Sequence, residues 1–300
     1  MFVLEIIVEK KLNIKKFIAA TLICIILMLV AINCVYDNFI SNKNKEATIG
    51  YVQEVEAKKQ EELKQKKELE EKKIKKYDAL NNDEIAKIEN IYEHSEPKRV
   101  FLTFDDGPTE AVTPFILDLL KKENIKGTFF VLGSMVENYP DLVKREYEEG
   151  HFIANHGYSH RYKEIYQSSD SVLDEYNRTN DLIKNAIGIP YYNSLVFGFP
   201  GGSSGGYYHD LKQEAKNKLK EQGIASLDWN ALTRDSEGAT TKEAIIENFS
   251  ETVQDKTSVV LLMHDASDKI LTYEALPDII TYFRNNGYVF KTVFDLFDRE

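Results

Sequence analysis

The chain has 300 residues, which is enough for one large domain with accessory segments. Its formal net charge of −11 argues against a nucleic acid as the main partner, because phosphate binding requires a basic surface; a neutral glycan is compatible with it. The only cysteines are Cys24 and Cys34, so the soluble part of the chain has no disulfide framework.

The first predicted element is an apolar membrane-spanning helix over residues 17–36. Its length is about the 20 residues that a helix needs to cross a bilayer. Lysines crowd residues 10–16 just before it, so we expect residues 1–16 to stay in the cytosol and the rest of the chain to lie outside the cell. A cleaved signal peptide and lipid attachment at Cys34 are alternatives, but the sequence matches both signals poorly.

Residues 37–96 form the next predicted segment, a charged stalk or linker. Residues 45–76 are rich in strong helix formers, with Glu and Lys three and four positions apart. Apolar residues are too sparse for a convincing coiled-coil seam. We therefore expect a solvated helical spacer.

The composition changes near residue 97, and residues 97–300 have the pattern of one α/β domain. Short apolar runs alternate with amphipathic segments, which predicts parallel strands joined by helical crossovers. The predicted strands are 100–104, 127–133, 151–156, 194–199, 224–229, 258–264 and 288–293, and the predicted helices are 114–125, 141–150, 211–223, 242–253 and 276–287. Polar residues follow several of these strands, and in a barrel of this kind chemistry collects at the carboxyl ends of strands.

Two adjacent carboxylates, Asp105 and Asp106, end the first of these strands before a Gly-Pro turn. Successive side chains diverge, so one carboxylate could bind a metal while the other faces a water or substrate. A solvated turn or a helix cap is the alternative for an isolated pair of this kind.

The sequence HGYSH places His156 and His160 four residues apart. This spacing could put both imidazoles on one side of a helical turn, where they could share a metal ion. Two histidines and one carboxylate leave positions open on zinc or a similar ion, as a catalytic site requires. A pair of unrelated histidines is the alternative.

Asp228 and Trp229 end another predicted strand, and His264 follows the apolar run VVLLM. A histidine at a strand end could donate a proton to a leaving amine. Asp228 could orient it and raise its pKa, and Trp229 and Leu262 could form a small apolar pocket. Ordinary core packing is the alternative for the two apolar residues.

Taken together, the series FDDG, HGYSH, FPGG, DWNAL and LMH resembles the polysaccharide deacetylases of carbohydrate esterase family four, the NodB-homology domain. The likeness covers about residues 97–300. It implies a distorted (β/α) barrel, a divalent metal ion that is usually zinc, with cobalt or another ion as alternatives, and hydrolysis of N-acetyl groups from amino sugars.

The resemblance also implies a role for each matching residue. Asp105 matches the general base, His264 the general acid and Asp228 the carboxylate that tunes that acid. The implied metal ligands are Asp106, His156 and His160. The implied substrate contacts are Gly201, whose backbone N–H matches the oxyanion donor, with Trp229, Leu262 and Pro200.

One position departs from the family pattern, because Gly198 stands where the third motif usually begins with arginine. That arginine normally lies beside the catalytic base, so its loss should leave Asp105 less well positioned and its pKa no longer lowered. We consider three outcomes: reduced activity, a substitute arginine, for which Arg234 is the candidate, or a domain that binds glycan without cleaving it.

The expected function is removal of N-acetyl groups from N-acetylglucosamine in peptidoglycan by a single-pass bacterial surface enzyme. N-acetylmuramic acid, chitin-like oligomers, a secreted N-acetylglucosamine polymer and O-acetylated xylan are alternative substrates. The expected partners are the cell-wall glycan and, through the N-terminal helix, the membrane; no obligate protein partner is evident. A tethered glycan-binding module is the non-enzymatic alternative.

Overall fold

The computed structural model describes residues 16–29, 32 and 43–299. It divides into two compact units, Met1–Glu70 and Glu71–Glu300. Within the described residues, we find no helix that is both long and apolar enough to cross a membrane. The predicted membrane-spanning segment 17–36 lies partly outside the described residues.

The charged segment is helical, as predicted: α2 covers Lys43–Lys75, which is 33 residues. Its pairs at four-residue spacing include Lys58 with Glu54 at 2.7 Å. Both partners are largely exposed, so each such pair contributes only a few tenths of a kcal/mol, roughly 0.3–0.5.

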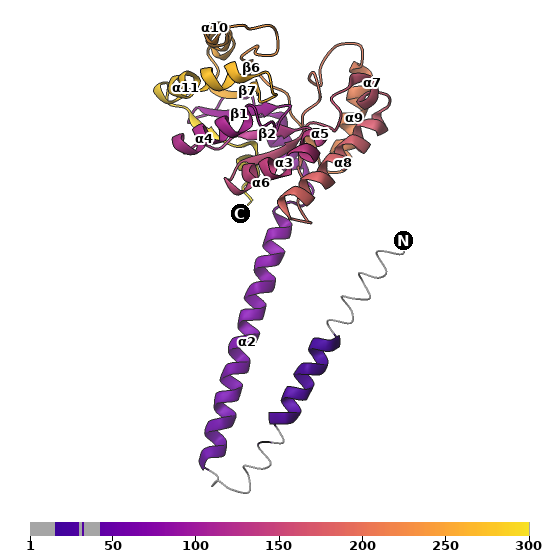
Figure 1. The fold of residues 1–300 in the computed structure, drawn as a ribbon, viewed down its shortest axis with the longest axis vertical. Helices are drawn as coiled ribbons and strands as arrows, with labels where there is room; N and C mark the ends of the chain where they lie inside the picture. The colour runs from indigo at the N-terminus through magenta and orange to yellow at the C-terminus, as the bar shows by residue number, and fades with distance from the viewer. Residues whose placement is uncertain (1–15, 30–31, 33–42, 300) are drawn as a thin grey trace. The chain divides into compact units, whose positions relative to one another are not determined.

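Eight strands form one sheet in which every pairing is parallel (Figure 1). The strand order is β5-β4-β3-β2-β1-β7-β6, and β8 also pairs with β1. The strands are β1 (Arg99–Asp105), β2 (Thr128–Val131), β3 (Phe152–Asn155), β4 (Val196–Phe197), β5 (Ala225–Ser226), β6 (Ala231–Leu232), β7 (Ser258–His264) and β8 (Val289–Lys291). The predicted α/β fold with parallel strands is confirmed.

The sheet curls into an incomplete barrel because its two edge strands are neighbours in the sequence. Residues 227–230 connect β5 to β6, although these strands lie at opposite ends of the strand order. Leu227 still bonds to β4 through the Phe197 carbonyl, and the Asn230 side chain already bonds to β7 at Ser258 and Val260. Four residues span at most about 14 Å, so the sheet must curl to bring the edges together.

Helices cover the outside of this sheet. They are α4 (Thr113–Glu123), α5 (Gly133–Asn138), α6 (Pro140–Glu148), α7 (Tyr162–Ile165), α8 (Ser169–Ile187), α9 (His209–Glu221), α10 (Lys242–Val253) and α11 (Ile270–Asn285), and the 3-10 helix η1 (Val293–Phe297) follows β8. In Figure 1, α7, α8 and α9 lie on one side of the unit, and α4, α10 and α11 lie on the other.

Side-chain alternation along the strands decides which residues face the barrel interior. In β1, Leu102 and Phe104 belong to the core cluster beneath the outer helices, whereas Phe101 belongs to the inner cluster. Alternate residues share a face, so Thr103 and Asp105 continue the inner face toward the carboxyl end of the strand. The same alternation in β7 places Leu262 and His264 on the inner face with Val260.

The folded unit begins earlier than residue 97, where we expected the stalk to end. Helix α3 (Asn82–Glu89) is capped by Asn81, whose side chain accepts hydrogen bonds from two backbone N–H groups of the first turn. Its Ile85 and Ile88 are buried in the inner cluster. Their i, i+3 spacing forms an apolar stripe that must be covered, so the helix packs on the barrel instead of extending the stalk.

Candidate metal centre and active site

The two carboxylates at the end of β1 take different positions, as predicted. Asp105 is the last residue of the strand, is 7% exposed and faces the interior. Asp106 has a φ of 75°, which turns the chain and directs its carboxylate beside two histidines. Such a left-handed conformation is costly for a residue with a Cβ, and residues of this kind cluster at functional sites.

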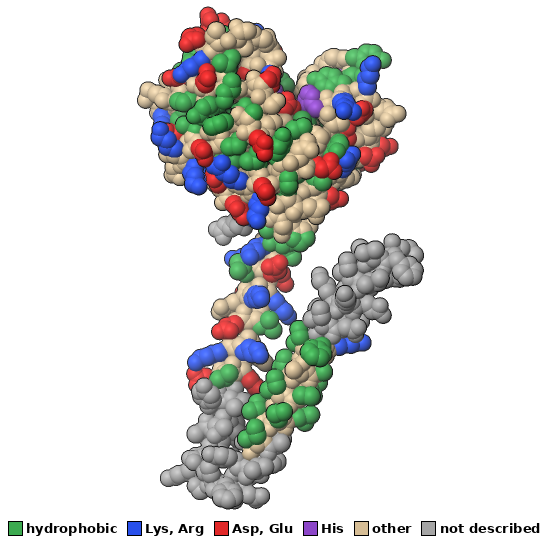
Figure 2. Space-filling view, in the orientation of Figure 1, with side chains coloured by type: hydrophobic (Ala, Val, Ile, Leu, Met, Phe, Trp, Pro, Cys, Tyr) green, Lys and Arg blue, Asp and Glu red, His purple; other side chains and the backbone are tan. Residues whose placement is uncertain are grey.

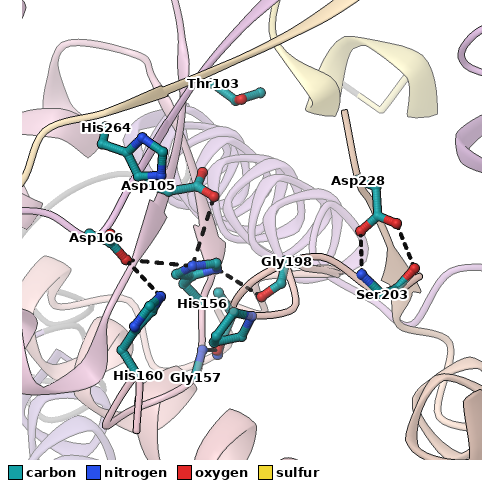
Figure 3. A network of polar contacts seen from close by, with 12 residues as sticks. Thr103, Asp105, Asp106, His156, Gly157, His160, Gly198, Ser203, Asp228 and His264 are labelled. Atoms are coloured by element: carbon teal, nitrogen blue, oxygen red, sulfur yellow. Dashed lines mark hydrogen bonds and ion pairs between the residues drawn. The ribbon is translucent and has the colours of Figure 1, made fainter. Parts of the chain in front are cut away.

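The two histidines come from the loop that follows β3. Their ring nitrogens Nε2 lie 3.6 Å (His156) and 3.3 Å (His160) from Oδ1 of Asp106 (Figure 3). The helical turn that we predicted between them is wrong: Gly157 and His160 have φ values of 75° and 56°, and the segment is a loop. Two left-handed residues, not a helical repeat, bring the imidazoles to one point.

Asp106, His156 and His160 could hold a divalent ion, since one ligand atom from each lies within 4.8 Å of the others. Oδ1 of Asp106 is buried without a hydrogen-bond partner among the described residues. Nδ1 of His156 lies 2.8 Å from the Gly198 carbonyl, which leaves Nε2 free to bind a metal. Burial lowers the pKa of His156 to about 4, with Asp106 partly opposing this, so the ring is neutral, as a metal ligand must be.

Asp105 is a buried carboxylate with few polar partners to offset the cost of its burial. Its Oδ1 has no hydrogen-bond partner within the described residues, and Oδ2 lies 3.8 Å from Nε2 of His156. Burial raises the pKa of Asp105 well above its ordinary value; His264 opposes this, and the neighbouring carboxylates add to it. Such a carboxyl has a high proton affinity, which suits a general base.

His264 is held by Asp235, a residue that the sequence motifs did not indicate. Nδ1 of His264 lies 2.8 Å from Oδ1 of Asp235, and the backbone N–H of His264 donates to Oδ2 at 2.8 Å. Burial alone would lower the pKa of His264, but Asp235, with smaller contributions from Asp105 and Asp106, raises it to about 9. His264 is therefore protonated at neutral pH and can donate from Nε2.

The predicted pairing of Asp228 with His264 is wrong. The Nδ1 of His264 is taken by Asp235, and the carboxylate of Asp228 has a different partner. The carboxylate of Asp228 accepts the backbone N–H of Ser203 at 2.8 Å and its hydroxyl at 2.6 Å, and Figure 3 shows the two residues apart from the histidines. Asp228 therefore holds the loop that follows β4.

The predicted role of Trp229 as a wall beside the reacting group stays a prediction. A Cβ added at Gly202 would lie 3.1 Å from Cη2 of the Trp229 ring, so the ring packs on the loop that contains Gly201. The ring also lines a pocket with Tyr92 and with Ile88 and Glu89 of α3, and no residue of the Asp–His–His cluster lines that pocket. By contrast, Leu262 lies on the inner face of β7, two residues before His264. Of these two apolar residues, only Leu262 shares a strand face with His264.

The loop that contains Pro200 and Gly201 passes close to the Asp–His–His cluster. Gly201 has a φ of 72°, and a Cβ there would lie 2.1 Å from the hydroxyl of Tyr162, two residues after His160. Among the described residues, the Gly201 N–H has no hydrogen-bond partner, so it is available to an oxyanion. The Pro200 carbonyl accepts a hydrogen bond from the buried Tyr166 hydroxyl at 2.7 Å.

Comparison with known proteins identifies the family. The profile of the polysaccharide deacetylase family matches residues 93–223. Peptidoglycan-N-acetylglucosamine deacetylase PgdA of Listeria monocytogenes is 33% identical over 216 residues, covering 71% of this chain but only 41% of that protein. A peptidoglycan-N-acetylglucosamine deacetylase of Bacillus cereus is 34% identical over 205 residues, covering 65% of this chain and 69% of that protein. A CE4 esterase structure from Streptococcus mutans matches with a TM-score of 0.61 at 30% identity, covering 71% of this chain and 91% of that one.

The chain belongs to the polysaccharide deacetylase family.

In this polysaccharide deacetylase, position 198 has no room for a side chain. A Cβ on Gly198 would lie 2.8 Å from Cδ1 of Phe130 and 3.1 Å from Nδ1 of His156. The Phe130 ring occupies the inner face of β2 next to this position. The glycine is thus part of a packed arrangement in which Phe130 fills space beside the metal ligand.

Arg234 does not replace the missing arginine, contrary to the prediction. Its side chain is exposed, and its nearest carboxylate partner is Glu237, at 3.9 Å. No lysine or arginine in the described part of the polysaccharide deacetylase forms an ion pair with Asp105. The cation that acts on Asp105 is the imidazolium of His264. The two residues stand opposite each other in the register of the neighbouring strands β1 and β7.

Proposed function

We propose that this protein is a metal-dependent N-deacetylase that acts on N-acetylglucosamine in peptidoglycan. The observation that carries the proposal is the inner-face arrangement in which Asp105 and His264 flank a cluster of Asp106, His156 and His160. The names of the Listeria and Bacillus relatives support peptidoglycan as the substrate. N-acetylmuramic acid, chitin-like oligomers, a secreted N-acetylglucosamine polymer and O-acetylated xylan are the alternatives.

In the proposed reaction, a water molecule adds to the acetamide carbonyl carbon and the C–N bond breaks, which yields acetate and a free amine. A divalent ion, with zinc as our first choice, held by Asp106, His156 and His160 would supply Lewis-acid polarisation of that carbonyl. Asp105 takes a proton from the attacking water, and the Gly201 N–H donates to the oxygen on which charge develops.

His264 completes the reaction by protonating the leaving nitrogen. Its Nδ1 is committed to Asp235, so the proton that it delivers is the one on Nε2. Asp235 keeps the imidazolium oriented and charged until the C–N bond breaks. Leu262, on the same face of β7, provides an apolar surface next to this histidine.

We further propose that the catalytic unit works outside the cell, tethered by residues 17–36. The lysines before this segment and its apolar composition support this location. Protease treatment of intact cells that express the tagged full chain should degrade the catalytic unit, and deletion of residues 17–36 should retain it in the cytosol. Full protection in intact cells would contradict the proposal.

The activity is tested with the full chain incubated with zinc or cobalt. We expect acetate release from purified peptidoglycan and from N-acetylglucosamine oligomers, and its loss in Asp105→Asn. Zinc should also raise the melting temperature of the wild type and of Asp105→Asn, but not of His156→Ala, because a ligand that binds only the folded state stabilises it.

A glycan-binding module is the second candidate, and the observation that favours it is that Gly198 stands in place of the motif arginine. It predicts the zinc-dependent rise in melting temperature without acetate release from any of the acetylated glycans. Acetate release that Asp105→Asn abolishes would eliminate this candidate.

A further inference from the structure

A line of tyrosine rings leads away from the Asp–His–His cluster. The ring centroids of His160 and Tyr162 are 5.9 Å apart, those of Tyr162 and Tyr208 are 6.4 Å apart, and those of Tyr208 and Tyr207 are 5.0 Å apart. We call Tyr162, Tyr208 and Tyr207 the tyrosine strip. It joins the start of α7 to the loop before α9, two segments that are far apart in sequence.

The two ends of the strip are open to solvent, and Tyr208 between them is partly buried. Tyr162 is 42% exposed and Tyr207 is 95% exposed, which is unusual for so large a ring. A Cβ added at Gly205 or Gly206, just before Tyr207, would meet nothing within 4 Å, so the space around the outer end is free. Figure 2 shows hydrophobic side chains gathered at the tip of the lobe formed by α7 and α9.

The strip hydroxyls are unused in the described part of the protein. None of the three donates or accepts a hydrogen bond within the described residues, whereas the neighbouring Tyr158 and Tyr166 donate to Glu137 and Pro200. Free hydroxyls beside exposed ring faces provide the two kinds of contact that a sugar needs. A pyranose ring has an apolar C–H face that packs on the negative face of an aromatic ring, and a rim of hydroxyls that form hydrogen bonds.

The inner end of the strip packs against the loop that carries the proposed oxyanion donor. The Tyr162 hydroxyl fills the space where Gly201 would carry a Cβ. Nζ of the buried Lys212 lies 5.9 Å from the Tyr162 ring and 4.7 Å from the Tyr166 ring. A ring fixed in this way loses little conformational entropy when it binds a ligand.

We propose that the tyrosine strip binds the sugar residues next to the one that is deacetylated, so that the protein selects chains of several sugars over short ones. This inference rests on the proposed function for its substrate class. A polymer whose reacting sugar lies at the Asp–His–His cluster must leave that cluster on some side, and the strip provides a continuous aromatic path from His160 to Tyr207. Such contacts, which are remote from the reacting bond, also raise turnover because their binding energy helps to position the reacting group.

The test uses the full chain with Asp105→Asn, so that bound glycan is not consumed, loaded with zinc. Calorimetry compares the dimer with the pentamer of N-acetylglucosamine. We expect the pentamer to bind at least about tenfold more tightly, and the added substitutions Tyr207→Ala and Tyr208→Ala together to remove that difference and leave dimer affinity unchanged. Phe115→Ala, at an aromatic ring of α4 that is 46% exposed, is the matched control.

Equal pentamer affinity in the double variant and the Phe115→Ala control would overturn the inference, as would equal affinity of dimer and pentamer in the parent protein. The inference would also be overturned if the double variant lost binding to anionic lipid vesicles but still bound the pentamer, because the strip would then contact a membrane. An unchanged zinc-dependent melting temperature shows that the variants are folded. Since the readout is binding, absent acetate release in the wild type would refute the proposed activity without deciding this inference.

Discussion

Asp235 organises the carboxyl end of β7 through three contacts. Its carboxylate, 3% exposed, accepts hydrogen bonds from the His264 backbone and the Thr272 hydroxyl and pairs with Nδ1 of His264. Burial would raise the pKa of Asp235, but these hydrogen bonds and the charge of His264 lower it. A buried ion pair of this kind is stable only when its remaining polar atoms are satisfied, which they are here.

Asp235→Asn removes the charge that keeps His264 protonated. In the wild type, the protonated fraction of His264 declines as the pH rises through its pKa of about 9. In the variant, burial is no longer opposed by Asp235, so this decline moves to lower pH. We expect kcat at pH 7 to fall about 100-fold and the alkaline limb of the pH–rate profile to shift down.

Asp228→Asn is the matched control, because within the described residues the Asp228 carboxylate accepts hydrogen bonds only from Ser203. Its alkaline limb should stay at the wild-type position. An alkaline limb that moves in Asp228→Asn and stays fixed in Asp235→Asn would show that the assignment of the two carboxylates is reversed.

Gly198→Ala tests the packing beside the metal ligand. The added methyl group would meet Phe130 and the His156 ring at the distances given above, and must displace one of them. We expect roughly tenfold weaker zinc binding, measured by competition with a chelator, because the group that orients His156 is the Gly198 carbonyl. Adding Phe130→Leu should recover most of the affinity, and wild-type zinc affinity in Gly198→Ala alone would refute the steric account.

The same contacts bear on the missing motif arginine. Any side chain at position 198 begins with the Cβ that Phe130 excludes. Gly198→Arg alone is therefore expected to disturb the site and not to restore a cation beside Asp105. A restored arginine would need a smaller residue at position 130.

At the scale of elements, helix α9 and the residues after β5 hold the Pro200–Ser203 loop from two sides. From α9, Nζ of Lys212 donates to the Gly202 carbonyl at 2.6 Å. From the other side, Asp228 accepts both the N–H and the hydroxyl of Ser203. The Gly201 N–H lies between these anchors, so its direction depends on both of them.

Lys212→Met keeps the buried side-chain volume but removes the cation that binds the loop carbonyl. We expect kcat to fall about tenfold. Complete removal of an oxyanion donor lowers kcat by more than this, whereas Lys212→Met only loosens the loop that carries the Gly201 N–H. Zinc affinity should not change, because no metal ligand contacts Lys212. Lys220→Met, on the same helix at an exposed pair with Glu89, is the control; equal kcat in both variants would contradict the positioning role.

The elements that sequence reasoning predicted are strands with an apolar run and helices with an amphipathic period. Strands β1 and β7 and helices α4, α6, α9 and α10 lie within about two residues of the predicted ranges, whereas α11 begins at Ile270, six residues before its predicted start. Strand β6 was not predicted, because its two residues carry no periodicity, and α8 was not, because its buried positions are partly polar: Thr179 and Asn180. Periodicity detects a face, and a two-residue strand has none.

The wrong pairing of Asp228 with His264 follows from the failure to predict β6. Without β6, the run IASLDW ended the last strand before β7, so Asp228 was the obvious neighbour of His264. In the structure, β6 pairs in parallel with β7, with Leu232 opposite Leu262. Asp235 follows three residues later and therefore lies beside His264 at the end of β7. The Asp–His–His cluster was easier to predict, because its residues follow the long strand β1 and the strongly buried strand β3.

At the scale of the whole molecule, the barrel buries a carboxyl group that the proposed chemistry does not use. Glu146 of α6 is 0% exposed, and neither of its carboxyl oxygens has a hydrogen-bond partner within the described residues. Burial, with a smaller contribution from the charge of Asp265, raises the pKa of Glu146 well above its ordinary value of 4.5. The folded unit therefore holds Glu146 as the neutral acid.

Glu146→Leu should stabilise the protein, and more so as the pH rises. The carboxyl group of the unfolded chain loses its proton as the pH rises through about 4.5, whereas that of the folded protein keeps it, so ionisation favours the unfolded state above that pH. At pH 8 we expect the variant to unfold with a free energy about 1–3 kcal/mol higher than that of the wild type, by urea titration, and the gain to shrink toward pH 5. Glu148→Leu, at an exposed position of the same helix, should give no such pH-dependent gain. If Glu146→Leu were instead destabilised, and most strongly at pH 8, the buried carboxyl group would be ionised and paired in the folded protein.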